Sequence, residues 1–106
     1  MLLGDFHPEA EIELEQFASN AQTARDAGSV ILQLDALETG GVPEGLVAVD
    51  QNGGVDLYPI YAGSLVAIVG IHGEQLLVLC VRRYASRLDE SAALKDARAR
   101  LTKGIS

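Results

Sequence analysis

The chain has 106 residues, 48% of them hydrophobic, and this size fits one domain with its own core, which we expect to span residues 1–106. Aromatic residues make up 5% of the chain and tryptophan is absent, so the core must be mainly aliphatic. The net charge of −7 argues against a protein that binds nucleic acid over most of its surface.

The first expected elements are a short strand over residues 1–6 and a helix that begins at Pro8. Proline suits the first turn of a helix, where its missing N–H is not needed. We expect Gly28 to end this helix, with Asp26 nearby as a turn residue. Apolar residues recur between these limits at spacings of three and four, which predicts one buried stripe: Ala10, Leu14, Phe17, Ala21 and Ala24.

A second helical pattern follows over residues 30–37. It stops at Thr39-Gly40-Gly41, which is typical of a helix C-cap, and Pro43 lies just beyond. The two helices are expected to form an antiparallel hairpin.

The hydrophobic period then changes to that of strands. Residues 46–49 form a short apolar run, and Asn52-Gly53-Gly54 is a strong turn signal. Alternating residues over 55–61 predict a strand. Pro59 confines this strand to a sheet edge or a bulge, because proline cannot donate to the ladder.

Two continuous apolar runs follow, residues 65–71 and 76–81, on either side of a hairpin turn at His72-Gly73-Glu74. Continuous rather than alternating apolarity indicates central strands with little free face, and a partner chain is a second way to cover them.

The end of the chain is helical again, and Ser86-x-x-Asp89 or Asp89 alone supplies its N-cap. Its inner stripe is Leu94, Ala97 and Leu101. The fold class is therefore α+β: a short N-terminal strand, a two-helix hairpin, a three- to four-stranded antiparallel sheet and a C-terminal helix. We expect the helices to pack on one face of the sheet.

The net charge conceals an uneven distribution. Residues 1–61 hold eleven Asp or Glu and one basic residue, Arg25, which gives −10. Residues 62–106 hold four Asp or Glu and seven Lys or Arg, which gives +3. This asymmetry predicts either a basic functional face on an acidic body or two charged helices that solubilise their own surfaces.

The single cysteine, Cys80, cannot form an internal disulfide, which fits a reducing cytoplasm. The opening sequence MLLGDFHPEAEIELE soon turns acidic, unlike a signal peptide. The longest apolar run, residues 65–71, is too short to span a membrane. We therefore expect a cytoplasmic protein with no membrane association.

Four segments, in this order, resemble the RelE/ParE superfamily of small bacterial toxins, especially its HigB-like branch. The third segment ends on a basic pair, where HigB-like members carry two lysines or arginines. The resemblance covers nearly the whole chain. The segments are FHPEAEIELEQF (6–17), LDALETGGVPEGLV (34–47), VDLYPIYAGSLVAIVGIHGEQLLVLCVRR (55–83) and LDESAALKDARARL (88–101).

The resemblance implies the toxin of a type II toxin–antitoxin pair, neutralised by a cognate antitoxin. Many members are mRNA endonucleases that cut on the ribosome and so inhibit translation, whereas members of the ParE type poison DNA gyrase. The nucleases use no metal or cofactor. They orient the ribose 2′-hydroxyl for attack on its own phosphate, which requires cations and a group that moves a proton.

Carried over to this sequence, the resemblance implies catalytic roles for Arg82, Arg83 and Tyr84. The candidates for binding RNA or a partner are Tyr61, Arg87 and Arg98. The alternative for the arginine pair is a solvated strand end beside acidic neighbours, and for Tyr84 a ring packed under the last helix. An imidazole can act as a general base near neutral pH, so His72 is a candidate for that role, and its alternative is a turn residue at the hairpin tip.

No metal site is predicted, because His7, His72 and Cys80 lack the spacing of metal ligands. Two positions at which the family usually has arginine hold Ile60 or Tyr61 and Ser64 or Leu65 instead. With the net charge of −7, these departures favour a second hypothesis.

In the second hypothesis the protein is a non-catalytic interaction module that binds an antitoxin-like peptide, a gyrase-like target or its own copy in a homodimer. The sequence leaves open whether the protein is an enzyme; if it is one, we expect a metal-independent endoribonuclease.

Overall fold

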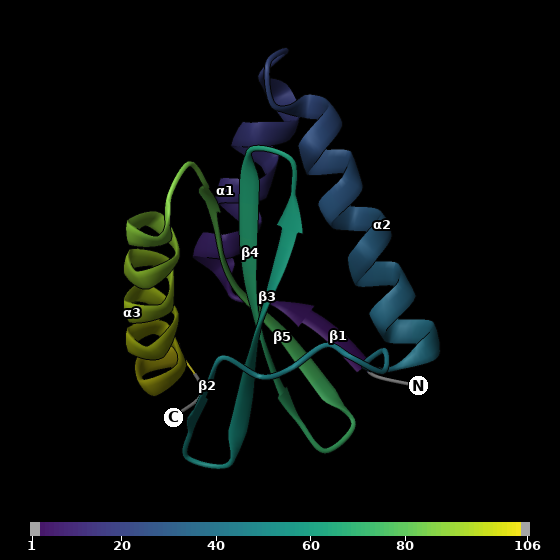
Figure 1. The fold of residues 1–106 in the computed structure, drawn as a ribbon, viewed down its shortest axis with the longest axis vertical. Helices are drawn as coiled ribbons and strands as arrows, with labels where there is room; N and C mark the ends of the chain where they lie inside the picture. The colour runs from purple at the N-terminus through teal and green to yellow at the C-terminus, as the bar shows by residue number, and fades with distance from the viewer. Residues whose placement is uncertain (1–2, 105–106) are drawn as a thin grey trace.

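The structure, a computed structural model, describes residues 3–104. The elements are β1 (Leu3–Phe6), α1 (Pro8–Ser19), α2 (Ala24–Gly40), β2 (Asp50–Asn52), β3 (Val55–Ala62), β4 (Leu65–His72), β5 (Gln75–Arg83) and α3 (Arg87–Gly104). The strands form one sheet in the order β1-β5-β4-β3-β2 (Figure 1). The α+β fold class is confirmed, and no helix in the described part is long and apolar enough to cross a membrane.

The sheet is mixed rather than antiparallel throughout. The pairs β2–β3, β3–β4 and β4–β5 are antiparallel, as predicted. Strand β1 adds a fifth strand, parallel to β5. Residues 1 and 2 of the expected first strand lie outside the described residues.

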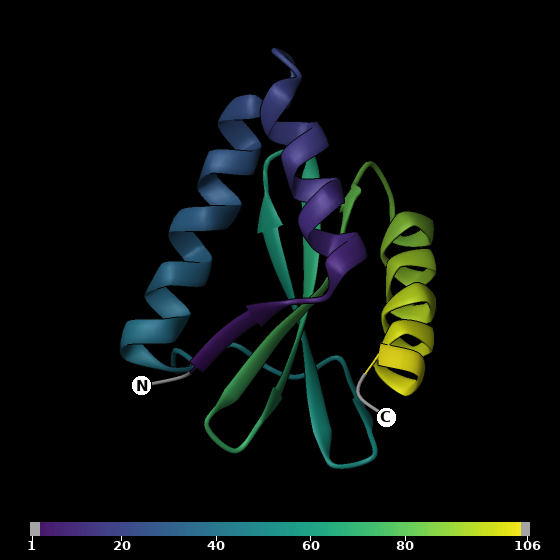
Figure 2. The ribbon, with the colours of Figure 1, turned by 180° about the vertical axis from the view of Figure 1, so that it is seen from behind.

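The helices cover both faces of the sheet. Helices α1 and α2 lie on one face, and α3 lies on the other, as the two opposite views show (Figures 1 and 2). The prediction that all helices share one face is therefore wrong. The continuous apolar runs of β4 and β5 have the same cause, because residues that point to either face are buried.

The junction between α1 and α2 lies earlier than Gly28. Asn20 Oδ1 accepts a hydrogen bond from the N–H of Gln22 at 2.9 Å. The hydroxyl of Thr23, which is only 1% exposed, donates to the carbonyl of Phe17 at 2.7 Å. These side chains satisfy backbone groups at the helix ends, so the chain breaks here. The prediction that Gly28 ends the first helix is wrong, since Gly28 lies inside α2.

The early break also corrects two smaller expectations. Ala21 and Ala24 are exposed, because they lie beyond the end of α1, whereas Ala10 and Leu14 are buried as predicted. Asp26 lies in the first turn of α2 rather than in a turn between helices. Its carboxylate accepts from the N–H of Ser64 at 3.0 Å and from its hydroxyl at 2.7 Å, which joins α2 to the turn between β3 and β4.

Two predictions are confirmed: the glycine C-cap of the second helix and the edge position of the strand that contains Pro59. Helix α2 ends at Gly40, and its C-cap is Gly41, which has φ 73° and donates its N–H to the carbonyl of Leu37 at 2.9 Å. Strand β2 pairs only with the first residues of β3, Val55 to Leu57, so β3 is an edge strand where Pro59 lies.

A β-bulge shapes β5. Ile68 pairs with Cys80 while Val69 pairs with Val78, which leaves Leu79 as the extra residue on β5. Leu79 and Cys80 both pack in the cluster under α3. Strand β1 pairs with β5 only as far as Val78, so beyond the bulge the outer edge of β5 has no neighbouring strand.

Two glycines test this arrangement. A Cβ at Gly28 would meet no atom within 4 Å, so Gly28→Ala should raise the free energy of unfolding by about 0.5–1 kcal/mol, the usual helix-interior gain. A Cβ at Gly70 would lie 2.9 Å from Val55 Cγ1, so Gly70→Ala should lower it by about 1–3 kcal/mol through overpacking. Urea unfolding measures both. A destabilised Gly28→Ala variant would contradict the position of α2.

Candidate functional site

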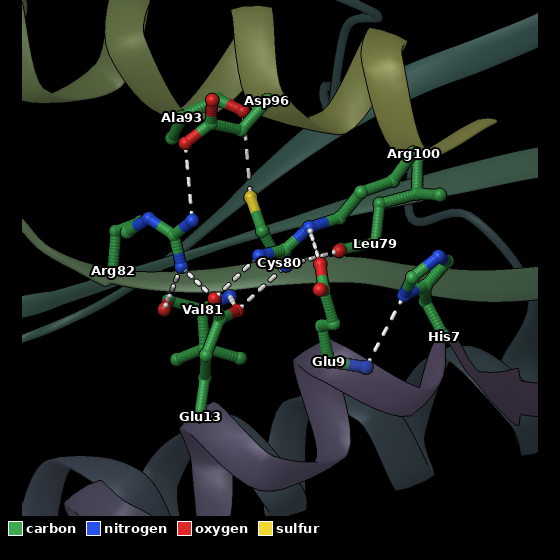
Figure 3. Close-up of polar contacts among 10 residues, drawn as sticks. All are labelled: His7, Glu9, Glu13, Leu79, Cys80, Val81, Arg82, Ala93, Asp96 and Arg100. Carbon is green, nitrogen blue, oxygen red and sulfur yellow. Dashed lines mark hydrogen bonds and ion pairs between the residues drawn. The ribbon is translucent and has the colours of Figure 1, made fainter. Parts of the chain in front are cut away.

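Arg82 lies on the open edge of β5, between α1 and α3 (Figure 3). Its guanidinium forms an ion pair with Glu13 of α1 and a second with Asp96 of α3, at 3.0 Å. The side chain is 31% exposed. The arginine expected to contact a phosphate therefore binds two carboxylates of its own chain.

Glu13 is the acceptor at the centre of this arrangement. It accepts from Nη1 and Nη2 of Arg100 at 2.8 and 2.7 Å, from Arg82, and from the N–H of Val81 at 3.1 Å. Arg100 Nη1 also donates to the carbonyl of Leu79 at 2.9 Å. Side chains of α1 and α3 thus satisfy backbone groups of β5 where β1 has ended.

We call this set the Glu13 cluster: Glu9, Glu13, Arg82, Asp96 and Arg100. Glu9 completes it through an ion pair to Arg100 Nε at 3.1 Å. Glu13 and Arg100 are its most enclosed members, with side chains 17% and 12% exposed. Ion pairs this sheltered are screened little by salt, so the cluster links α1, β5 and α3 firmly.

The surroundings of Glu13 and Arg82 favour the charged form of each side chain. Burial alone would raise the pKa of Glu13, but the hydrogen bonds from Arg100, Arg82 and the Val81 N–H hold that pKa below its usual 4.5. Burial alone would lower the pKa of Arg82, but Glu13 and Asp96 raise it overall. Both groups stay ionised at neutral pH, so neither is suited to take up or release a proton there.

Cys80 lies directly beside the cluster but is chemically quiet. Its thiol donates to the carbonyl of Ala93 at 3.4 Å, and burial raises the pKa of the thiol to about 11. A thiol that stays protonated is a weak nucleophile. No group of three or more His, Cys, Asp or Glu residues between positions 3 and 104 is arranged to hold a metal ion.

The two candidate tyrosines pack together. The ring centroids of Tyr61 and Tyr84 are 5.2 Å apart, with the ring planes at 52°. Tyr61 is 46% exposed and its hydroxyl donates to Glu90 of α3. Burial and this bond raise the pKa of Tyr61 to about 12, so its phenol is a poor base at neutral pH. Tyr84 is half-buried against the cluster under α3, as its alternative interpretation expected.

The other candidates are spread over the molecule. Arg83 is exposed and forms no ion pair within residues 3–104. Arg87 is exposed at the start of α3, where its charge acts on Tyr61. Arg98 forms an ion pair with Asp50 of β2. The candidate residues therefore divide into four places: Arg82 in the Glu13 cluster, Arg98 against β2, Arg83 exposed at the end of β5, and Tyr61, Tyr84 and Arg87 at the start of α3.

Sequence reasoning missed Glu13, Asp96 and Arg100 as partners of Arg82. The only sequence signal is spacing. Glu9 and Glu13 are four residues apart and share one face of α1, and Arg100 lies next to the inner stripe of α3. Spacing cannot reveal that these two helices meet at β5.

Sequence reasoning also missed a groove of about 420 Å³ between α2 and β3, which we call the α2–β3 groove. At its edge, Gln33 Nε2 donates to the carbonyl of Tyr61 at 2.9 Å. Tyr61 is the one candidate residue that lines it. The lining is mainly apolar: Gln33, Ala36, Leu37, Gly40, Gly41, Pro43, Leu46, Pro59, Ile60 and Tyr61.

Removing the charge of Glu13 tests its role. Glu13→Gln should lower the free energy of unfolding by about 2–3 kcal/mol at pH 7, because it removes the carboxylate that two partly buried guanidinium groups share and leaves Arg82 only Asp96 and Arg100 only Glu9. The lowered pKa of Glu13 makes its contribution complete above pH 4.5 and lost as the pH falls through the lower, folded-state value. The difference between wild type and variant should therefore shrink in acid.

Denaturant unfolding at a series of pH values measures this difference. Glu15→Gln is the matched control, since Glu15 is exposed on the same helix and should change stability by less than about 0.5 kcal/mol. Equal effects of the two variants would contradict a structural role for Glu13.

The Tyr61–Glu90 bond is tested by titration. Glu90→Gln removes the negative charge beside the phenol, so the pKa of Tyr61 should fall from about 12 towards 10. Ultraviolet absorbance of the phenolate measures this pKa, and Tyr61→Phe identifies which transition belongs to Tyr61. An unchanged transition in Glu90→Gln would show that Glu90 does not hold the phenol.

No protein-family model matches the sequence, and no curated protein is similar enough to count as a relative. The structure does match a solved chain described as belonging to the chromosomal ParDE toxin–antitoxin system from P. aeruginosa. The match has a TM-score of 0.56 and 13% sequence identity, and it covers 80% of this chain and 98% of that one. The chain therefore has the fold of a ParDE-system component, as the resemblance to the RelE/ParE superfamily implied.

Proposed function

We propose that the protein is the toxin-like component of a toxin–antitoxin pair and that it acts by binding a protein target, such as a gyrase, rather than by cleaving RNA. The fold shared with a ParDE-system chain supports the first part. The observation that carries the second part is the pairing of Arg82 with Glu13 and Asp96. A guanidinium that already holds two carboxylates is not free to stabilise the charge on a scissile phosphate.

The positions of the proton-carrying groups support the same proposal. Metal-independent cleavage requires a group that moves a proton near the phosphate. His7 accepts from the N–H of Glu9 as the cap of α1, and His72 Nδ1 lies 3.0 Å from the carbonyl of Gly54 at the hairpin tips. His7 meets the Glu13 cluster only through the backbone N–H of Glu9, and neither imidazole is bonded to a side chain of the cluster.

We propose a cognate antitoxin as the partner and the α2–β3 groove as its docking site. The groove is mainly apolar, and the loop that borders it exposes Val42 and Val47, which are 36% and 73% exposed. Apolar side chains beside a groove are typical of a surface that a partner covers. We further propose that residues 1–106 act as one domain in this complex.

A second candidate is a HigB-like mRNA endonuclease that acts on the ribosome. Three observations favour it: the exposed Arg83 without an ion pair in the described part of the chain, Arg87 nearby, and the Tyr61–Tyr84 pair. An exposed aromatic ring that stacks on a base contributes about 1–3 kcal/mol. In this version Arg83, not Arg82, would meet the phosphate.

Expression in a bacterium and two assays with purified protein distinguish these functions. Under the first proposal, expression arrests growth, the protein inhibits supercoiling by gyrase, and in vitro translation proceeds unchanged. Under the second, translation falls and the mRNA is cut. Arg83→Ala should then restore translation by about tenfold or more, since removing a cation from a transition state typically slows the reaction by that factor. Arg82→Lys should have little effect. Normal growth with abundant soluble protein would contradict both.

A further inference from the structure

We propose that the partner segment that docks in the α2–β3 groove is a cationic amphipathic helix. This inference rests on the proposed function, and it names the chemistry of the partner. Three features of the groove carry it: its apolar floor, a strand edge that does not accept another strand, and the absence of any positive charge along the segment that forms it.

The floor of the groove suits apolar side chains. It is formed by Ala36 and Leu37 of α2, Pro43 and Leu46 of the following loop, and Pro59 and Ile60 of β3. Its volume of about 420 Å³ lies within the range of roughly 300–1,000 Å³ found for ligand sites. The groove therefore has room for a few large aliphatic or aromatic groups from one face of a partner.

The edge of β3 opposes the addition of a strand. Pro59 has no N–H to donate to a ladder, and the carbonyl of Tyr61 already accepts from Gln33 at 2.9 Å. Further along, the carbonyl of Leu57 accepts from the N–H of Val49 at 2.9 Å. A strand needs a row of available backbone groups, whereas a helix satisfies its own backbone and presents side chains. The edge thus favours a helix.

The charge of the surrounding segment selects a cationic helix. All ten lining residues lie between positions 33 and 61, and this segment contains no Lys, Arg or His. Helix α2 has no basic residue in its last turn, so the negative end of its dipole, at Gly40, lacks a local cation. Complementary charge guides a partner and excludes partners of like charge. The segment holds five carboxylates, of which Asp50 already pairs with Arg98. The other four form no ion pair within residues 3–104: Asp35, Glu38, Glu44 and Asp56.

A second copy of this chain fits the groove less well. Its basic helix is α3, but Arg98 already pairs with Asp50 and Arg100 with Glu9 and Glu13. Docking α3 into another copy through these two arginines would require their pairs to separate, and the apolar side of α3 is already buried against its own sheet. A partner with its own unpaired lysines or arginines meets no such competition.

Two synthetic helical peptides serve as probes for the full-length chain. Both carry leucine at i, i+3, i+4 and i+7, and their polar positions are all lysine in one peptide and all glutamate in the other. Fluorescence anisotropy measures binding at low and high salt. We expect saturable binding of the lysine peptide, weaker at high salt, and at least about tenfold weaker binding of the glutamate peptide.

Matched variants locate the binding. Gly40→Phe places a ring in the groove and should weaken binding of the lysine peptide by about tenfold, whereas Gly28→Phe, on the same helix but outside the groove, should not. Glu44→Lys should weaken binding by about three- to tenfold, and Glu74→Lys, at the β4–β5 turn, should not. Neither glycine substitution meets an atom within 4 Å at Cβ, and the two lysine variants alter exposed positions, so folding does not limit the test.

The outcomes separate this inference from the proposed function. Equal or tighter binding of the glutamate peptide would overturn the cationic partner. If Gly40→Phe then abolished binding of the glutamate peptide, the groove would still be a docking site. Binding of neither peptide, or binding that Gly40→Phe does not change, would overturn the inference as well. A dimer that buries the groove, detected by ultracentrifugation, would replace the partner with a second copy. Growth arrest and gyrase inhibition test the proposed function independently of all these results.

Discussion

The carboxylate of Glu13 is the interaction on which the arrangement of α1, β5 and α3 depends. Strand β1 pairs with β5 only to Val78, and the polar backbone groups beyond it are enclosed between two helices. Such groups require partners. Glu13 accepts from Val81, and Arg100, itself held by Glu13, donates to Leu79. The short first strand therefore creates a need for side-chain hydrogen bonds, and the ion pairs of the cluster follow from it.

This constraint also explains the distribution of charge along the sequence. The basic C-terminal part folds back on the acidic N-terminal part: Arg82 and Arg100 meet Glu13, and Arg98 meets Asp50. The predicted choice between a basic functional face and two self-solubilising helices was incomplete, because these charges neutralise one another across the fold. The carboxylates that the arginines leave unpaired keep the surface acidic, including the segment that forms the α2–β3 groove.

The sequence predicted features that local chemistry controls. Glycines with positive φ ended α2 and formed the turns, and apolar runs located β4 and β5. It could not predict that α3 covers the opposite face, because a buried stripe does not identify the layer it meets. It also did not identify Asn20 and Thr23, whose side chains hold the turn between α1 and α2. The pairing of Glu13 with Arg100 joins positions 87 residues apart, which no spacing rule connects.

Arg82 and Arg83 are adjacent in the sequence, but the ion pairs of the Glu13 cluster hold only Arg82. Releasing Arg82 towards a phosphate would leave Asp96 without its cation and would leave the enclosed carboxylate of Glu13 with Arg100 alone, which costs stability. Arg83 faces the other way, and its movement breaks no ion pair in residues 3–104. Of these two arginines, Arg83 is therefore the one that can meet an anion without breaking an ion pair of residues 3–104. Tyr61 links this end to the α2–β3 groove, since it lines the groove and packs on Tyr84, the neighbour of Arg83.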